Sequence, residues 1–375
     1  MKKKIGFIYF DEIHHIHHFL GSFLELYKDK NLQVEIITYK GGNHEYLYYL
    51  LELNNIPRDV VIEAPTYKYR EVLNKLRKRK RPSIHFLFKK NRKLLSKYDV
   101  LVYNTARQSY MIKYRGKKKW PKLVFLDHGA GDRNYIYNEK IANFDLVCIA
   151  GDKVLDLCKD SADFSNVNIK ACGYQKFETV LKENEDIKLF NNNKPTVLYN
   201  PHFMKGITSY YKKGKEILDF FYNNDDYNLI FAPHLILFNR KGHLNPNDFD
   251  AKYYKKDNIH VDLGSVHSVN MRYTLLADIY LGDVSSQVYE FLLKPRPCIF
   301  INAHNVNWQN NKHYANWQLG KVIEDVSELE EVLKSAPSWH KDYIEKQKEV
   351  FNYTFKQDEI PASKRIATEI KKILE

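Results

Sequence analysis

The chain has 375 residues, of which 44% are hydrophobic and 28% are charged. This length and mixture suit two ordinary domains with full cores and exclude disordered and fibrous classes. Basic residues exceed acidic ones by 13, and most of the excess lies between Lys68 and Lys97, where thirteen basic residues accompany one acid, Glu71. Such a block indicates a local anionic partner or a solvated helix rather than general nucleic-acid binding.

Short β-branched runs alternate with helix-length amphipathic segments, as is typical of mainly parallel sheets covered on both faces. The predicted strands are Ile5–Phe10, Val34–Tyr39, Val100–Asn104, Lys122–Asp127, Leu146–Ala150, Asn168–Gly173, Thr196–Tyr199, Asn228–Ala232, Ile259–Asp262, Asp278–Leu281 and Pro297–Asn302. The predicted helices of the second half are Lys212–Tyr222, Ser265–Leu276, Val326–Ser335, Trp339–Phe351 and Ala362–Leu374.

This order predicts an α/β fold with two Rossmann-like domains that face a cleft, at residues 1–183 and 196–355. The polar segment 184–195 predicts a linker. Residues 356–375 predict a final helix that packs back across the hinge.

The apolar run Ile5–Phe10 is too short for a signal peptide, and no window approaches the ~18 apolar residues of a membrane span. The four cysteines lack CxxC spacing, which favours buried free thiols in a reducing compartment. We therefore expect a cytoplasmic protein.

Ligands of open α/β sheets bind beyond the carboxyl ends of the strands, so the residues that follow each strand deserve inspection. His128 follows one predicted strand beside Gly129, where it can act as a general base or merely cap the next helix. His234 follows a strand of the second half, and His202 stands in a similar place.

A fourth junction runs from Asp283 through Ser285, Ser286 and Gln287 to Glu290. The serines are predicted to begin a helix, so that N–H groups and hydroxyls converge where a phosphate can bind. Glu290 lies one turn further, at the depth of a ribose. The alternative is an ordinary serine-capped helix with a solvated Glu290.

A fifth junction, Gly173-Tyr174-Gln175-Lys176, predicts a turn and a cation near the phosphates. The segment from His14 to His18 permits a metal interpretation, because His14, His17 and His18 share a face of an α-helix. A metal site needs a further ligand, so we favour an acceptor-side loop or a polar helix face.

The basic block continues into Ile84, Phe86, Leu87 and Phe88. Cations beside apolar residues suit an anionic bilayer, where each contributes roughly 1 kcal/mol. Nucleic-acid binding is the alternative of a different class, and a solvated helix with Phe86 and Leu87 in the core is the simplest interpretation.

In this order, the junctions resemble the motifs of the CDP-glycerol glycerophosphotransferase family, the polymerases and primases of teichoic acids and related capsules. His128-Gly129, Gly173-Tyr174, His234 and Asp283-Val-Ser-Ser286 occupy the places of its Trp-His-Gly-Thr-Pro, Gly-Tyr-Pro-Arg, Lys-x-His-Pro and Asp-Tyr-Ser-Ser motifs. The resemblance extends from about Phe125 to Ile301.

The resemblance implies a GT-B fold with the nucleotide donor on the second domain and the acceptor on the first. It assigns catalysis to His128 and His234, with His128 as base. The resemblance places the nucleotide phosphates on Ser285 and Ser286. With the residues of the other junctions, the predicted nucleotide and phosphate ligands are Asp283, Ser285, Ser286, Gln287, Glu290, Gly173, Tyr174, Lys176 and His202. The acceptor-side candidates are Asp11, Glu12, His14 and Arg133, and any of the first three is an alternative base.

The implied donor is a CDP- or CMP-linked group rather than a UDP-linked one, and neither a metal nor another cofactor is required. We therefore predict a transferase that adds glycerol phosphate, another polyol phosphate or a sugar to a cell-surface polymer or lipid-linked acceptor. Residues 68–97 would hold it on the inner face of the plasma membrane, without nucleic acid as a partner. The alternatives are a sugar-nucleotide epimerase-like enzyme and a nucleic-acid-binding protein.

Overall fold

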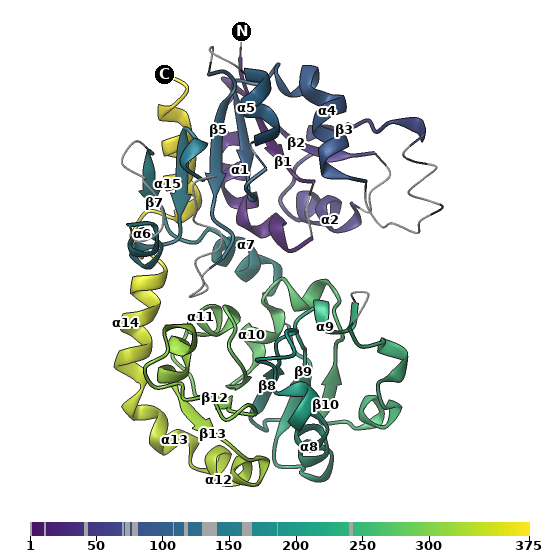
Figure 1. The fold of residues 1–375 in the computed structure, drawn as a ribbon, viewed down its shortest axis with the longest axis vertical. Coiled ribbons are helices and arrows are strands. Elements are labelled where there is room, and N and C mark those ends of the chain that lie inside the picture. The colour runs from purple at the N-terminus through teal and green to yellow at the C-terminus, as the bar shows by residue number, and fades with distance from the viewer. Residues whose placement is uncertain are drawn as a thin grey trace. The chain divides into compact units, whose positions relative to one another are not determined.

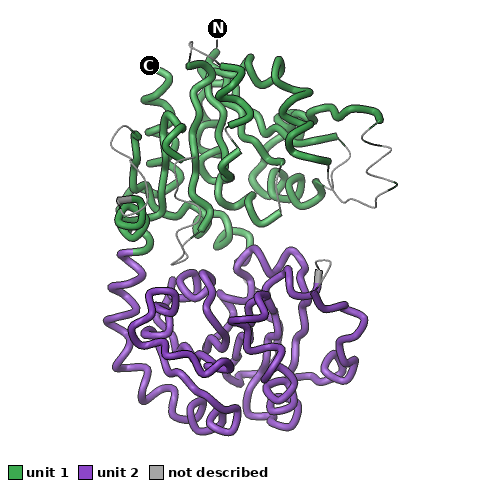
Figure 2. The backbone as a smooth tube through the Cα atoms, viewed as in Figure 1, with its two compact units in different colours: residues 1–129, 134–183, 354–375 green, residues 130–133, 184–353 purple. Residues whose placement is uncertain are grey.

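The computed structural model of the chain describes residues 2–10, 13–40, 44–69, 71, 76, 82–107, 109–115, 119–129, 141–159, 167–185, 187–239 and 243–375. They form two compact units, drawn in green and purple in Figure 2. Unit 1 contains described residues of the ranges 1–129, 134–183 and 354–375, and unit 2 contains those of 184–353. The end of the chain therefore belongs to the same unit as its beginning.

Unit 1 is built on a sheet of seven parallel strands (Figure 1). In sheet order they are β3 (Val61–Ala64), β2 (Leu32–Tyr39), β1 (Lys3–Ile8), β4 (Val100–Tyr103), β5 (Lys122–Leu126), β6 (Leu146–Ile149) and β7 (Ile169–Ala171). The order reverses between β1 and β4, which makes that position the switch point of a doubly wound sheet.

Alternating residues of these strands face two separate cores, because successive side chains of a strand point to opposite faces. One core joins the sheet to α1 (Leu20–Tyr27), α2 (Glu45–Leu53) and α15 (Ala362–Lys372). The other joins it to α4 (Ile84–Leu95), α5 (Ser109–Arg115) and α6 (Asp152–Lys159). The remaining helices are η1 (Ile13–His18), η2 (Arg58–Val60), η4 (Ile141–Asn143) and α7 (Lys176–Glu183).

Unit 2 repeats the plan with six parallel strands. In sheet order they are β10 (Ile259–Val261), β9 (Asn228–Phe231), β8 (Thr196–Asn200), β11 (Ile279–Gly282), β12 (Cys298–Ile301) and β13 (Lys321–Ile323). The switch point of this sheet lies between β8 and β11. The predicted α/β class with two parallel Rossmann-like sheets is confirmed.

The helices of unit 2 are mostly short. They are α8 (Tyr210–Asn223), α9 (Ile236–Asn239), η5 (Pro246–Asp248), η6 (Ala251–Lys255), η7 (Val266–Ser268), α10 (Arg272–Leu276), α11 (Gln287–Phe291), η8 (Lys312–Leu319), η9 (Val326–Glu328), α12 (Leu329–Lys334), α13 (Ala336–Trp339), η10 (His340–Asp342) and α14 (Ile344–Thr354). The predicted helix Ser265–Leu276 is wrong, because Met271 takes a left-handed conformation with φ of 61° between η7 and α10.

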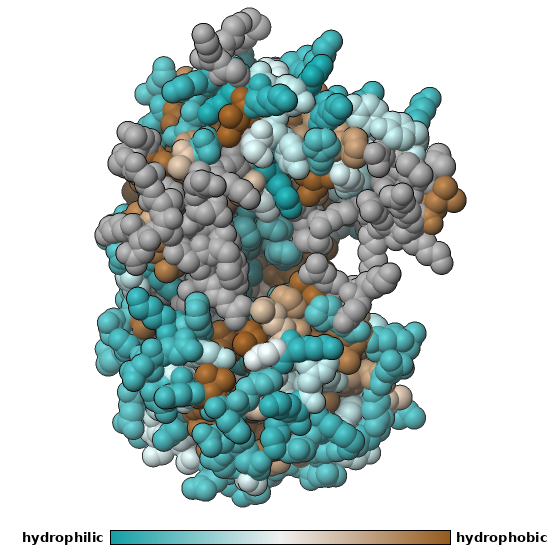
Figure 3. Space-filling view, viewed as in Figure 1, coloured by the Kyte–Doolittle hydropathy of each residue, from teal (hydrophilic) through white to brown (hydrophobic). Residues whose placement is uncertain are grey.

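None of the described helices combines the length and the apolar character that a membrane crossing needs. The face drawn in Figure 3 is mainly hydrophilic where it is described, and hydrophobic side chains occur on it in small groups. Leu76, at 75% exposure, is the most exposed of the large hydrophobic side chains among the described residues.

Candidate functional site

The predicted site residues of unit 1 follow the carboxyl ends of its strands. The histidine-rich η1 follows β1, Asp127 and His128 follow β5, and Gly173 follows β7. Asn104, directly after β4, donates its side-chain amide to the carbonyl of His18 over 3.3 Å. The switch point of the sheet therefore brings η1 and the end of β4 together.

The histidines of η1 face different surroundings because η1 is a 3-10 helix. Such a helix has three residues per turn, so side chains three apart eclipse one another. His15 and His18 share a side, whereas the sequence interpretation assumed an α-helix that groups His14, His17 and His18. His15, His17 and His18 are all buried.

His128 packs among the histidines of η1. Its ring centroid lies 4.6 Å from that of His15 and 6.1 Å from that of His18, and His14 lies 4.3 Å from His15. We call these four residues and Lys176 the histidine cluster. The structure thus brings the predicted His128 and His14 together. It adds His15, which was not predicted, and His18, which the sequence suggested only as part of a metal site.

The segment Gly173-Tyr174-Gln175-Lys176, which follows β7, contacts the histidine cluster. Tyr174 lies 5.4 Å from the His18 ring, centroid to centroid. Gln175 donates to the carbonyl of His18 and accepts from the amide of Ser22, both over 2.6 Å. Gly173 has a φ of +89°, and a Cβ there would lie 2.9 Å from the carbonyl oxygen of Lys356. Only glycine fits such a position without strain.

The electrostatics of the cluster are those of crowded basic groups. The pKa of His18 is lowered well below 6.5, first by burial and then by the charges of Lys176, His128, His15 and His14. His18 is therefore neutral at physiological pH. Its Nδ1 is buried and has no hydrogen-bond partner among the described residues.

His17 turns away from the cluster into a second network. Its Nδ1 lies 2.9 Å from the Thr179 hydroxyl, and its Nε2 lies 2.6 Å from the Tyr46 hydroxyl and 3.3 Å from a Glu183 carboxylate oxygen. Tyr46 in turn donates to Glu183 over 2.7 Å. These bonds hold η1 against α2 and α7.

Three predicted acceptor-side residues, Asp11, Glu12 and Arg133, lie outside the described residues, as does most of the basic block from 70 to 81. The described cations of that block include Lys89, Lys90 and Lys93, which are exposed on α4. Leu87 and Phe88 are buried in the core of unit 1. Those two apolar side chains cannot enter a bilayer while the unit is folded.

In unit 2, His202 and His234 follow β8 and β9, and their ring centroids lie 5.4 Å apart. Nδ1 of each ring accepts a backbone N–H, from Met204 over 3.1 Å and from Ile236 over 3.2 Å. A ring nitrogen that accepts carries no proton, so the neutral rings carry their proton on Nε2. The pKa of His234 is lowered to about 4 by burial and by the charge of His243.

Asp283 is a structural residue in the interior of unit 2. It is fully buried, and its carboxylate accepts the backbone N–H groups of His202 over 2.9 Å and of Ser209 over 3.0 Å. Burial raises its pKa to about 6, although hydrogen bonds from Ser209, His202 and Thr208 oppose the shift. Asp283 thus fixes the loop that carries His202, and has no exposed atom to offer a phosphate.

The serines that follow Asp283 begin α11, which has only five residues, so its dipole is small. Ser286 is exposed, and the Ser285 hydroxyl accepts the backbone N–H of Gln287 over 3.2 Å. Gln287 and Glu290 line a narrow pocket with Asn200 and Ala232, at the carboxyl ends of β8 and β9.

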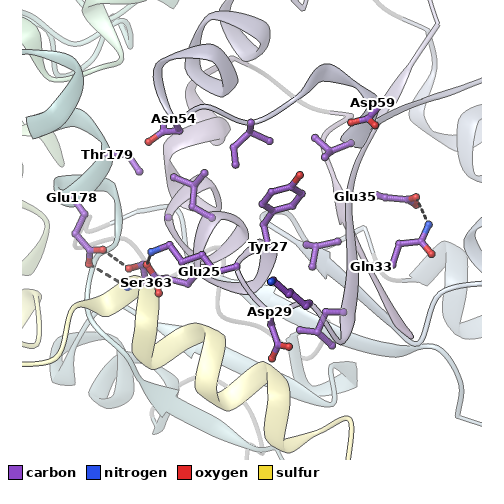
Figure 4. A pocket seen from close by; sticks show the side chains of 18 of the residues that line it. Glu25, Tyr27, Asp29, Gln33, Glu35, Asn54, Asp59, Glu178, Thr179 and Ser363 are labelled. Carbon is purple, nitrogen blue, oxygen red and sulfur yellow. Dashed lines mark hydrogen bonds and ion pairs between the residues drawn. The ribbon is translucent and has the colours of Figure 1, made fainter. Parts of the chain in front are cut away.

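A larger pocket of about 970 Å³ lies elsewhere in unit 1 (Figure 4). Its lining includes residues 32–35 at the start of β2, and it contains no residue of the histidine cluster. Four of its carboxylates have partners within the unit: Glu25 with Lys28, Asp29 with Lys371, Glu35 with Gln33, and Glu178 with Ser363. Its size alone therefore does not make it the site.

No group of three or more His, Cys, Asp or Glu side chains within the described ranges is arranged to hold a metal ion. His15 and Gln175 were given no role in the site from the sequence, and His18 was considered only as a metal ligand. The strand-end position of the histidines was visible in the sequence, but the hydrogen bonds that join Gln175 to His18 of η1 and to Ser22 of α1 span more than 150 residues and leave no local pattern.

Comparison with solved structures identifies the fold. The wall teichoic acid polymerase TagF matches with a TM-score of 0.64 at 16% identity, over 100% of this chain and 89% of that chain. The MnaA–UDP structure from S. aureus matches with a TM-score of 0.62 at 13% identity, over 99% and 97%. The UDP-GlcNAc 2-epimerase from Neisseria meningitidis bound to UDP-GlcNAc matches with 0.58 at 14% identity, over 100% and 99%.

Two parallel doubly wound sheets of this kind define a GT-B-like α/β enzyme. The family model of CDP-glycerol:poly(glycerophosphate) glycerophosphotransferases matches residues 173–372, which is more than half of the chain. The chain belongs to this family and is a GT-B transferase. No curated protein sequence matches it significantly.

Proposed function

We propose that this protein transfers a glycerol phosphate or a related polyol phosphate from a CDP-linked donor to a hydroxyl of a cell-surface polymer or its lipid-linked precursor. Teichoic acids and capsule polymers are the acceptors that this chemistry suits. In this reaction His128 acts as the general base, and no metal is needed.

One observation carries the proposal. Within the part of the chain that matches the family, His202 and His234 both follow strand ends, and both hold their ring proton on Nε2. Preorganised N–H donors of this kind stabilise negative charge that develops on phosphate oxygens. Ser285, after the neighbouring strand β11, adds a hydroxyl at the same edge of the sheet.

The reaction has one bond made and one broken. The acceptor oxygen attacks the phosphorus that bears the glycerol, and the bond from that phosphorus to the oxygen of the leaving CMP breaks. His128 takes the proton of the attacking hydroxyl, and CMP leaves with the electron pair while His234 and His202 donate hydrogen bonds to its phosphate.

A panel of donors tests this function. We expect CMP release from CDP-glycerol only when an acceptor hydroxyl is present, and a loss of donor binding when Ser285→Ala and Ser286→Ala are combined. Transfer should persist in EDTA. Absence of nucleotide binding by calorimetry would sink the proposal, whereas conversion of UDP-GlcNAc to its epimer would favour the epimerase alternative, which the fold also permits.

We also propose that the basic block holds the protein on the inner face of the plasma membrane. The support comes from Lys89, Lys90 and Lys93, which are exposed on α4. Since Leu87 and Phe88 lie in the core, this attraction is mainly electrostatic. Sedimentation with vesicles that contain anionic lipid, but not with neutral vesicles, is the expected result, and it should be lost at high salt. Binding to an oligonucleotide with equal affinity would favour the nucleic-acid alternative.

A further inference from the structure

We propose that the histidine cluster of unit 1 is a binding site for a phosphate group of the acceptor. The inference rests on the proposed function, because it takes the acceptor to be a chain of phosphodiester-linked units. It assigns to His14, His15, His18 and Lys176 a role beside that of His128: they hold the acceptor phosphate next to the attacking hydroxyl.

The first support is the sign of the local potential. The charges that act most strongly on His18 come from Lys176, His128, His15 and His14, and all of them lower its pKa. These basic neighbours therefore disfavour a positive charge on His18. An anion placed there is favoured by the same basic groups that disfavour a positive charge on His18.

The second support is an unsatisfied polar atom. His18 is 4% exposed, and its Nδ1 has no hydrogen-bond partner within the described ranges. A buried ring nitrogen without a partner costs free energy, and such atoms in folded proteins usually mark a missing ligand or water. When His18 carries its proton on Nδ1, this atom can donate to a phosphate oxygen.

The third support is rigidity. Gln175 binds the carbonyl of His18 and the amide of Ser22 over 2.6 Å, and His17 is held by Thr179 and Tyr46. These hydrogen bonds therefore hold η1 in place before any ligand binds. A site that is organised in advance loses little conformational entropy on binding.

The location matches the role. η1 and His128 follow β1 and β5 at the carboxyl edge of the sheet, beside its switch point. When an acceptor phosphate binds His15 and Lys176, the neighbouring hydroxyl of the same acceptor molecule lies within reach of His128. The donor phosphate, by contrast, has its own hydrogen-bond donors in unit 2.

The test compares two acceptors that differ in one group: a synthetic glycerol phosphate dimer joined by a phosphodiester, and diglycerol, which lacks the phosphate. With CDP-glycerol as donor, His15→Gln and Lys176→Met should each raise KM for the dimer about tenfold, the usual loss for one charge-assisted hydrogen bond. KM for diglycerol and for CDP-glycerol should not change. His14→Gln, at a half-buried position, serves as a second variant if His15→Gln unfolds the protein.

Matched controls are His313→Gln and Lys364→Met, which change exposed residues outside the cluster. Equal losses with both acceptors overturn the inference, and a raised KM for CDP-glycerol would assign the cluster to the donor phosphate instead. Calorimetric titration with the dimer in the absence of donor separates the two proposals. Binding that Lys176→Met weakens tenfold supports the site even if no donor is turned over, whereas turnover without such weakening leaves only the proposed function standing.

Discussion

His202 and His234 of unit 2 differ from the clustered histidines of unit 1 in how their ring nitrogens are held. In unit 2, a backbone N–H occupies Nδ1 of both His202 and His234, so the position of the ring proton is fixed by the fold. In unit 1, the rings of His15, His18 and His128 pack against one another, and His18 keeps an unsatisfied Nδ1. A ring with a fixed N–H donor can stabilise the negative charge that develops on a leaving group. A cluster of histidines can instead bind an anion or take up and release a proton.

The largest expected effect concerns the two histidines assigned to chemistry. His128→Gln should lower kcat by about 10²–10⁴, the usual contribution of a general base. His234→Gln should lower it by about 10²–10³, as for the loss of an oxyanion donor. Initial rates of CMP release measure both, and His313→Gln provides the control. A loss of less than tenfold for both variants would remove the assignment.

The pH dependence of the reaction sharpens this distinction. His234 has a pKa of about 4, below the ordinary 6.5, so it stays a neutral Nε2–H donor throughout the neutral range. Its protonation should reduce kcat only near pH 4. An acid limb near pH 6.5 that disappears in His234→Gln, measured as kcat against pH, would contradict the buried and neutral state of this ring.

The sequence predicted the central strands of both sheets well because they are buried on both faces and read as apolar runs. It missed β3 and β13, two of the four edge strands, whose residues are partly exposed, although it found the other two, β7 and β10. Edge strands lack a continuous apolar run, so their signal is weak. The prediction of strand-end histidines succeeded for the same reason that the central strands did, since it needed only the position where each run ends.

Details inside the loops were not readable in the same way. The cluster geometry depends on η1 being a 3-10 helix, which shifts the shared face from His14 and His17 with His18 to His15 with His18. Asp283 looked like a phosphate ligand because it precedes the serines, but the hydrogen bonds that occupy it come from a loop more than 70 residues away. Local spacing carries no information on such partners.

The next largest effect is on the stability of unit 2. The pKa of Asp283 is raised to about 6 from 3.8, so the folded state binds more protons than the unfolded state between these values, and stability falls as pH rises through this window. Relative to Asp283→Asn, the wild type should lose up to about 3 kcal/mol from pH 4 to pH 6. Urea unfolding across this range measures the difference.

Asp248→Asn changes an exposed carboxylate of the same unit and serves as the control. It should leave the pH dependence of stability unchanged. If Asp283→Asn also leaves the pH dependence of stability unchanged, burial does not raise the pKa of the Asp283 carboxyl. Other contacts must then hold the loop that carries His202.

The smallest effect compares the pH response of the two units. Burial and basic neighbours lower the pKa of His18 well below 6.5. Below pH 6.5, His18 therefore binds a proton in the unfolded chain but not in the folded unit, and the stability of unit 1 falls as pH drops. His18→Gln should reduce this loss in unit 1, because glutamine does not titrate. In unit 2 the lowered pKa of His234 acts in the same direction, but the raised pKa of Asp283 opposes it. Hydrogen exchange of each unit at pH 7 and pH 5 should therefore show that unit 1 loses more protection than unit 2. An equal loss in both units would mean that the lowered pKa of His18 does not affect the stability of unit 1.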